Sequence, residues 1–132
     1  MATHNSLFAD SDVRRHPDGI AVSIQLPWYR SLWLSCVDDV AAKVNGVEIP
    51  KEDLRFELQG KTYTIAELPE QWDTLWFVAD KPQVIIPISP LPEVGGKLRV
   101  EVTLTLRLLY MQIAPMRYVG NRVQIEREVV LA

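Results

Sequence analysis

The sequence predicts an all-β protein, an antiparallel β-sandwich of jelly-roll-like type with at most one short helix. Apolar residues recur at every second position in several segments, turn residues separate these segments, and only one stretch suits a helix. With 132 residues, 48% of them hydrophobic and 23% charged, the chain has the size and composition of one globular domain, residues 1–132. The first six residues are expected to be disordered, as unanchored termini often are.

The longest predicted strand covers residues 97–111. Every second residue from Leu98 to Tyr110 is apolar, and the residues between them are polar as far as Arg107. This period of two is typical of a strand with one buried and one solvated face. Residues 121–131 form a further alternating segment. The segment 20–26 repeats the pattern, and four of its side chains are expected to point inward: Ile20, Val22, Ile24 and Leu26.

Turn signals separate these strands. The turn at Pro17–Gly19 predicts a hairpin between its two flanking segments. Asn45-Gly46 favours a type I′ hairpin because both residues tolerate a positive φ, and Gln59-Gly60 repeats this logic. The segment 83–92 is predicted as a strand that cannot be central near Pro87, since proline donates no hydrogen bond to a sheet. We therefore expect roughly eight short strands.

The only helical candidate is Thr64–Trp72, which Pro69 limits to about one or two turns. Gly95-Gly96 directly precedes the long strand and predicts a turn. No alternation of strands and helices is present, which excludes a parallel α/β fold.

Charge and composition exclude several classes of protein. The net charge is −3, and the 14 basic residues form no stripe that would neutralise nucleic-acid phosphates. No segment approaches the about 20 apolar residues of a membrane span, and the first residues lack the apolar region of a signal peptide. Cys36 is the only cysteine, which excludes an intrachain disulfide. We expect a soluble, cytoplasmic protein that binds neither nucleic acid nor membranes.

Few residues are suited to catalysis or metal binding. His4 and His16 are the only histidines, and neither has the spacing of a metal-binding motif, so no metal site is expected in this chain. The acidic flank of Cys36 would raise the pKa of a thiol, and the residue is expected to be a buried apolar one. The chain contains no nucleophile-elbow, P-loop or dinucleotide motif. No catalytic residue is predicted.

The aromatic residues offer the clearest candidates for binding. The stretch Pro27–Cys36 reads "PWYRSLWLSC" and follows a predicted strand, where a sheet gives way to a loop. Its aromatic and arginine side chains are the types enriched at binding hot spots. Trp33 has the opposite parity to Leu32 and Leu34, so its side chain lies either in the core or at an interface. The core is the better expectation for any single aromatic residue, including Trp72, Trp76 and Phe77.

Several segments, in this order, give the chain a family resemblance. They are Pro27–Ser35, the Gly60-x-x-Tyr63 turn, a tryptophan-containing segment and Arg107-x-x-Tyr110-Met111. Over about residues 7–131 the chain resembles the β subunit of bacterial C-glycoside deglycosidases. Trp28 stands where that family tends to have Tyr, which preserves a large ring. Ser31 stands where it tends to have Gly, which changes the conformations open to the loop and bears on substrate preference.

The resemblance implies a non-catalytic subunit of a two-component enzyme. The partner α subunit would be a (β/α)₈ TIM barrel that carries a divalent metal, usually manganese, and the catalytic acid and base. The substrates would be C-glycosylated flavonoids or polyphenols oxidised to 3-keto sugars, and elimination would break the carbon–carbon glycosidic bond at or near the subunit interface. The resemblance suggests these interface or pocket residues: Trp28, Tyr29, Arg30, Trp33, Arg107, Tyr110 and Met111.

Two alternatives remain from the residues alone. One is a free-standing carbohydrate- or polyphenol-binding module, because β-sandwiches with exposed tryptophans stack flat rings. The other is a homo-oligomeric sandwich without a ligand. Ligand binding by the isolated chain would favour the module, and a gene for a barrel subunit beside this one would favour the enzyme subunit.

Overall fold

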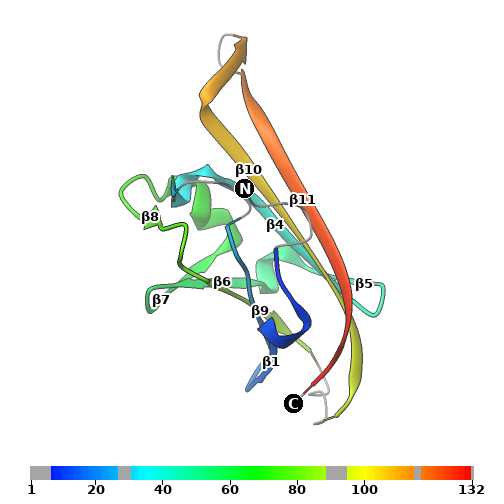
Figure 1. Ribbon diagram of the computed structural model, residues 1–132. Coiled ribbons are helices and arrows are strands. Elements are labelled where there is room, and N and C mark those ends of the chain that lie inside the picture. Colours follow the sequence, from blue (N-terminus) through cyan, green and yellow to red (C-terminus); the bar gives the residue numbers. More distant parts are fainter. Residues whose placement is uncertain (1–6, 27–30, 89–94, 115–116, 132) are drawn as a thin grey trace.

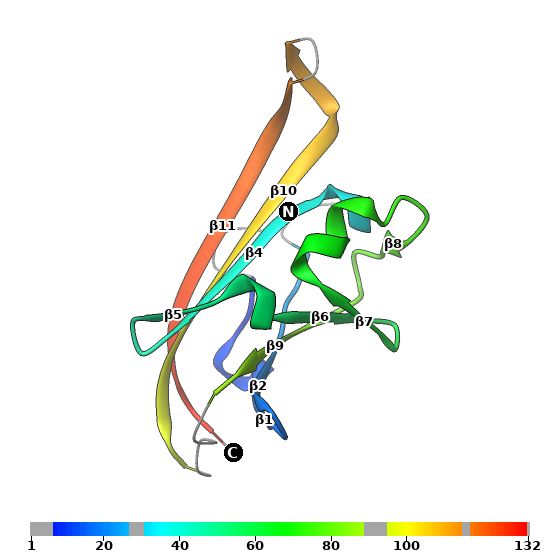
Figure 2. The ribbon, with the colours of Figure 1, turned by 180° about the vertical axis from the view of Figure 1, so that it is seen from behind.

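The computed structural model describes residues 7–26, 31–88, 95–114 and 117–131, with the side chains of all these residues except residue 10 and residues 107–121. The expected disorder of residues 1–6 falls outside the described residues. Two antiparallel sheets share one apolar core, and a pair of long strands runs along one side of the molecule (Figures 1 and 2). The predicted all-β antiparallel sandwich is confirmed.

The first sheet has five strands that are short and close in length. In spatial order they are β1 (Val13–His16), β2 (Gly19–Ser23), β9 (Gln83–Pro87), β6 (Arg55–Leu58) and β7 (Lys61–Thr64). β1 and β2 form the predicted hairpin across the turn before Gly19, with His16 opposite Gly19. The four inward-pointing residues expected between Ile20 and Leu26 are all fully buried.

Gly19 is where two strands approach each other most closely. A side chain there would collide with the Ile86 carbonyl oxygen and lie 2.5 Å from the Ile88 backbone nitrogen. Glycine is therefore required by close backbone contact with β9.

The second sheet contains the longest strands. In spatial order it comprises β11 (Arg117–Val130), β10 (Lys97–Ala114), β4 (Val37–Val44) and β5 (Val47–Ile49). The predicted alternation in β10 is confirmed as far as Leu106, because Val100, Val102, Leu104 and Leu106 are buried in the core. Apolar burial on this face holds the sheet against the first one.

Both predicted glycine turns adopt the expected geometry. Asn45 and Gly46 have φ values of 52° and 82°, and Gln59 and Gly60 have values of 53° and 81°. Positive φ at both central residues matches the right-handed twist of the strands they join. Asn45 also bonds to β10: its N–H donates to the Arg99 carbonyl oxygen (2.7 Å), and its side-chain oxygen accepts the Arg99 N–H (2.9 Å).

The prediction that the strand at Pro87 cannot be central needs correction. β9 is the middle strand of the five and pairs with both β2 and β6. The restriction applies only to Pro87 itself, which is the last residue of β9 and faces Gly19. β6 pairs with β9 no further than Ile85, so the missing proline N–H interrupts no ladder on that side.

The remaining elements are short. β3 (Leu32–Trp33) and β8 (Leu75–Trp76) form a two-stranded sheet. The helix predicted within Thr64–Trp72 is the 3₁₀ helix η5 (Ile65–Glu70), which begins after the N-cap Thr64 and contains Pro69. The other 3₁₀ segments among the described residues have three residues each: η2 (Asp10–Asp12), η3 (Leu34–Cys36) and η4 (Lys51–Asp53).

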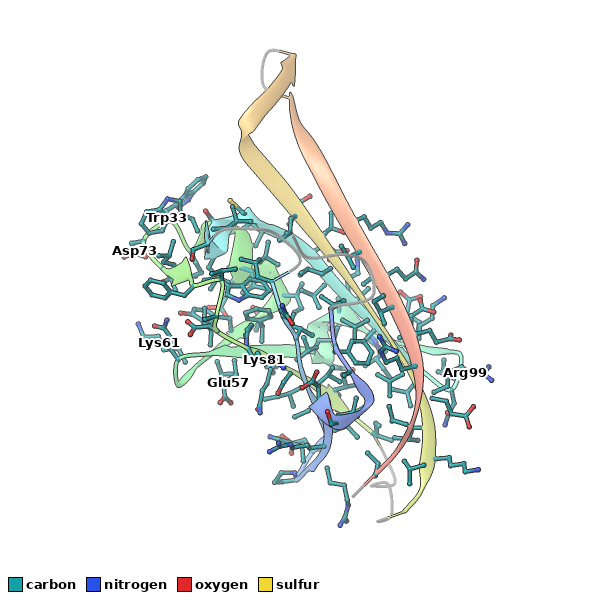
Figure 3. The ribbon with its side chains drawn as sticks, viewed as in Figure 1. Trp33, Glu57, Lys61, Asp73, Lys81 and Arg99 are labelled. Atoms are coloured by element: carbon teal, nitrogen blue, oxygen red, sulfur yellow. The ribbon has the colours of Figure 1, made fainter. Side chains whose placement is uncertain are left out.

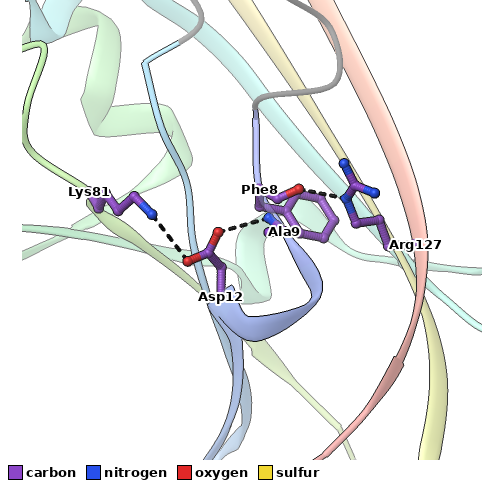
Figure 4. A network of polar contacts seen from close by, with 5 residues as sticks. All are labelled: Phe8, Ala9, Asp12, Lys81 and Arg127. Atoms are coloured by element: carbon purple, nitrogen blue, oxygen red, sulfur yellow. Dashed lines mark hydrogen bonds and ion pairs between the residues drawn. The ribbon is translucent and has the colours of Figure 1, made fainter.

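The N-terminal segment connects the two sheets (Figure 4). Leu7 and Phe8 are buried, and the Phe8 carbonyl oxygen accepts a hydrogen bond from Arg127 Nε of β11 at 2.6 Å. Asp12 accepts the Ala9 N–H at 2.8 Å and forms an ion pair with Lys81, which precedes β9 (3.2 Å). These contacts close one side of the core.

Candidate functional site

The structure describes the seven predicted site residues to different extents. Trp28, Tyr29 and Arg30 lie outside the described residues. Arg107, Tyr110 and Met111 lie within β10, whose backbone is described there while these side chains are not. Both the backbone and the side chain of Trp33 are described, so Trp33 is the predicted site residue whose surroundings the structure shows.

Trp33 points away from the core. Its neighbours Leu32 and Leu34 are buried, whereas 49% of Trp33 is exposed. The period of two in β3 therefore sends Trp33 to the open face. Of the two predicted positions, the core is wrong and the exposed face is observed.

Hydrogen bonds hold β3 and η3 against the segment 71–78. The Leu34 N–H donates to the Thr74 carbonyl oxygen (2.7 Å), and the Ser35 N–H donates to the Gln71 carbonyl oxygen (3.1 Å). On the other side of Trp33, the Val78 N–H donates to Ser31 Oγ at 2.8 Å. Two segments about forty residues apart in sequence thus form one small surface.

This surface is rich in exposed apolar side chains. Besides Trp33, it exposes Trp72 (62%), Phe77 (51%) and Val78 (43%). We call these four residues the aromatic corner. Trp33 lies at one edge of the molecule, away from the long strands, together with Asp73, which follows Trp72 (Figure 3).

Trp76 is the buried counterpart of these residues. It is fully buried, its indole N–H donates to the Asp80 carbonyl oxygen at 3.1 Å, and its ring meets Phe56 edge-on with the centroids 5.7 Å apart. The expectation that aromatic residues are core residues is therefore right for Trp76 and wrong for Trp72 and Phe77. The parity of Phe77, opposite to that of Trp76, was the available signal for its exposure.

A hairpin projects from the four-stranded sheet (Figure 1). β4 pairs with β10 only as far as Leu106, which pairs with Val37. From Arg107 onward, β10 pairs with β11 alone among the described strands, and the two extend well beyond the rest of the molecule (Figure 1). We call residues 107–121 of this hairpin the arm. Its sequence, "RLLYMQIAPMRYVGN", is largely apolar.

A short chain segment connects the corner to the base of the arm. η3 directly follows Trp33 and packs on β10, and Val37, the residue after η3, pairs with Leu106. The predicted stretch around Trp33 and the predicted residues that begin at Arg107 are therefore brought to the same end of the fold.

The two segments that carry the corner are acidic. The described segments 31–38 and 64–80 contain no Lys or Arg; their acidic residues are Asp38, Glu67, Glu70, Asp73 and Asp80. A hollow of about 330 Å³ lies beside η5, and three of its lining residues are acidic. Its lining is Asp38, Asp39, Lys51, Glu52, Ile65, Ala66 and Pro69. Lys51 forms an ion pair with Asp39 at 2.6 Å.

Glu67 is the acidic residue with a defined local role. Its Oε1 accepts the Thr64 backbone N–H and the Thr64 hydroxyl, both at 2.9 Å. These hydrogen bonds, with a smaller contribution from the positive charge of Arg55, lower the pKa of Glu67 below its usual value of 4.5. The carboxylate thereby fixes the start of η5, the helix that precedes Trp72.

The described residues offer little catalytic machinery. No three His, Cys, Asp or Glu side chains among them converge as a metal site would require. His16 is half-buried in the β1–β2 turn, where Nδ1 accepts the Asp18 N–H at 3.1 Å, and Cys36 is buried. In the described part of the chain, no helix is long and apolar enough to span a membrane.

Comparisons with known proteins identify a family. Residues 3–110 match the family model described as C-glycoside deglycosidase beta subunit. A protein of that description from Arthrobacter globiformis is 79% identical over 132 residues, all of both chains. A 3'-dehydrocarminate deglycosidase beta subunit from Microbacterium sp is 33% identical over 86% of this chain and 80% of its own length. The chain therefore belongs to the C-glycoside deglycosidase beta subunit family, whose description implies a partner subunit in a hetero-oligomer.

Proposed function

We propose that this chain is a non-catalytic subunit that packs on a metal-dependent TIM-barrel α subunit and helps to shape the pocket in which C-glycosides are cleaved. The single observation that carries the proposal is the exposed aromatic corner, whose residue Trp33 is joined through η3 and Val37 to the point where β4 stops pairing with β10 and the arm begins. An apolar two-stranded ribbon with no further strand beside it is marginally stable alone and gains stability from a partner. The assembly would operate in the cytoplasm.

The substrates would be 3-keto C-glycosides of flavonoids or other polyphenols. One relative is named for a 3'-dehydro substrate, which supports an oxidised sugar as the substrate class. A ketone at C3 acidifies the proton on C2. Removal of this proton by a base allows the bond between C1 and the aglycone carbon to break, and the aglycone carbon then takes up a proton. The reaction is an elimination, so the complex would be a lyase.

Catalytic groups would come from the α subunit. A divalent metal held there, manganese, would polarise the ketone. Glycosidases of the ordinary kind place two carboxyl groups across the scissile bond. In this chain, Asp38 and Asp39 are adjacent but differently placed: Asp39 pairs with Lys51, whereas Asp38 is exposed. Neither is offered here as a catalytic acid.

This chain would supply contact surface and exclude water from the pocket. The proposed interface or pocket residues are those the family resemblance suggests: Trp28, Tyr29, Arg30, Trp33, Arg107, Tyr110 and Met111. Of these, Trp33 has a described side chain, and its exposed indole is suited to burial against a partner.

The test is a turnover assay with separated subunits. We expect aglycone release from a 3-keto C-glycoside when this chain, the α subunit and manganese are combined, and none from this chain alone. Aglycone release at the full rate by the α subunit without this chain would overturn the proposal.

The exposed tryptophans also support a second candidate, a free-standing polyphenol-binding module. It predicts that a C-glycoside quenches or shifts the tryptophan fluorescence of the isolated chain. An unchanged spectrum at millimolar glycoside would count against it.

A further inference from the structure

We infer that the aromatic corner, and not only the stretch before it, is a docking surface for an apolar recess of the α subunit that is bordered by lysine or arginine side chains. This inference rests on the proposed function, because it specifies where and how the two subunits would meet. It concerns residues outside the seven suggested by the family resemblance, with the exception of Trp33.

The first support is the exposure of the aromatic side chains. Trp33, Trp72 and Phe77 are each about half exposed or more, and β3 and β8 hold the two segments side by side. Elsewhere, the large apolar residues exposed in the described part of the chain are Val47 and Val130, which lie on other strands. Clustered aromatic residues on a soluble domain mark an interaction site, whereas scattered apolar residues do not.

The second support is the sign of the surrounding charge. Glu70 and Asp73 flank Trp72 and are exposed, and neither forms an ion pair with another described residue. The open face of the four-stranded sheet is different, because acids and bases there are mixed and Arg99 pairs with Glu126 at 3.8 Å. A surface with an aromatic centre and an acidic rim is complementary to an apolar recess with a basic rim.

The hollow beside η5 extends this complementarity. Ile65, Ala66 and Pro69 provide an apolar wall. Of the charged residues that line it, Lys51 is paired with Asp39, and Asp38 and Glu52 add two further acidic side chains. Such a combination accommodates the aliphatic stem and cationic head of a lysine or arginine from the partner. Pro69 directly precedes Glu70, so one wall of the hollow belongs to the helix that leads to Trp72.

The third support is the ordered framework beneath the corner. Trp76 is anchored in the core by its indole hydrogen bond and its contact with Phe56, and Glu67 caps η5. The exposed rings therefore project from fixed backbone, which lowers the entropy lost on docking.

The experiment measures the dissociation constant between the full-length chain and the α subunit at two salt concentrations. One variant, Trp72→Ser/Phe77→Ser, removes the rings, and a second, Glu70→Lys/Asp73→Lys, reverses the charge. Matched controls make the same changes elsewhere: Val47→Ser/Val130→Ser for apolar residues and Glu48→Lys/Glu128→Lys for charge. Circular dichroism checks the fold of each variant.

We expect the ring variant to bind at least about tenfold more weakly, as truncation of hot-spot aromatics does. The charge variant should bind more weakly at low salt, and this difference should shrink at high salt, where surface charges are screened. Both controls should bind like the wild type. If the ring variant does not fold, the charge variant still decides the question.

Wild-type affinity in both corner variants would overturn the inference and leave the proposed function standing, with the interface elsewhere. A wild-type chain that does not bind the α subunit would overturn both. A corner variant that changes only the self-association of the isolated chain would also overturn the inference, because the surface would then serve a second copy.

Discussion

Trp72 and Trp76 are the same residue type four positions apart, and they have opposite environments. Trp76 is fully buried with a satisfied indole N–H, whereas Trp72 is 62% exposed. Position relative to the short strand β8 therefore decides whether a tryptophan stabilises the fold or remains available for contact.

Replacement of each tryptophan should separate these roles. Trp76→Ala should lower the free energy of unfolding by about 3–5 kcal/mol, because it leaves a cavity and removes a hydrogen bond. Trp72→Ala should change it by no more than about 0.5 kcal/mol. Urea denaturation of both variants provides the measurement. Equal losses of stability would show that Trp72 is also a core residue.

Glu67 makes stability depend on pH in a defined direction. Its pKa is lowered in the folded state, so its stabilising contribution is complete above its usual pKa of 4.5 and is lost as the pH falls through the folded-state pKa. Glu67→Gln should therefore lower the thermal midpoint at neutral pH, and the difference from wild type should narrow in acid. A difference that is constant across this range would contradict the assignment.

At the scale of elements, the two glycine turns look alike but differ in their anchoring. Both have positive φ at each central residue, yet only Asn45 bonds to a third strand through its side chain and backbone, at Arg99 of β10. Asn45 thereby ties the β4–β5 hairpin to the strand that continues into the arm.

Alanine substitutions at the two turns provide a matched comparison. Asn45→Ala should lower the free energy of unfolding by about 2 kcal/mol, since it removes a hydrogen bond and a residue that tolerates positive φ. Gln59→Ala has the same backbone requirement but removes only an exposed bond to Asp80, so it should cost about 0.5 kcal/mol or less. Equal losses of unfolding free energy in the two variants would show that the hydrogen bond between Arg99 and the Asn45 side chain adds nothing to stability.

The sequence predicted some elements well because their signals are local. Period-two alternation in β10 and Asn-Gly at the β4–β5 turn depend on neighbouring residues alone. The central position of β9 and the exposure of Trp72 depend on long-range packing: β6 pairs with β9 no further than Ile85, and β3 lies against β8. No local pattern contains that information.

The whole molecule combines a packed sandwich with a hairpin that extends beyond it. β4 pairs with β10 up to Leu106, and past this residue no described strand other than β11 pairs with β10. The corner is joined to the base of this hairpin through η3 and Val37. One partner that contacts both would bury the arm and the aromatic side chains together.

Amide hydrogen exchange should show that the arm is less protected than the four-stranded sheet. In the isolated chain, the amides around Leu108 and Val119 should exchange faster than those around Val102 and Ile125, because among the described strands β4 pairs with β10 only as far as Leu106. Addition of the α subunit should slow exchange in the arm and leave the sheet unchanged. Unaltered exchange in the arm upon binding would exclude it from the interface.

The most direct test of the central claim, that this chain is an assembling subunit, is co-purification. The chain would be co-expressed with the α subunit and purified through a tag on this chain only. The account predicts that the α subunit is retained in a fixed ratio through size exclusion. Elution of this chain alone, with no α subunit, would contradict it.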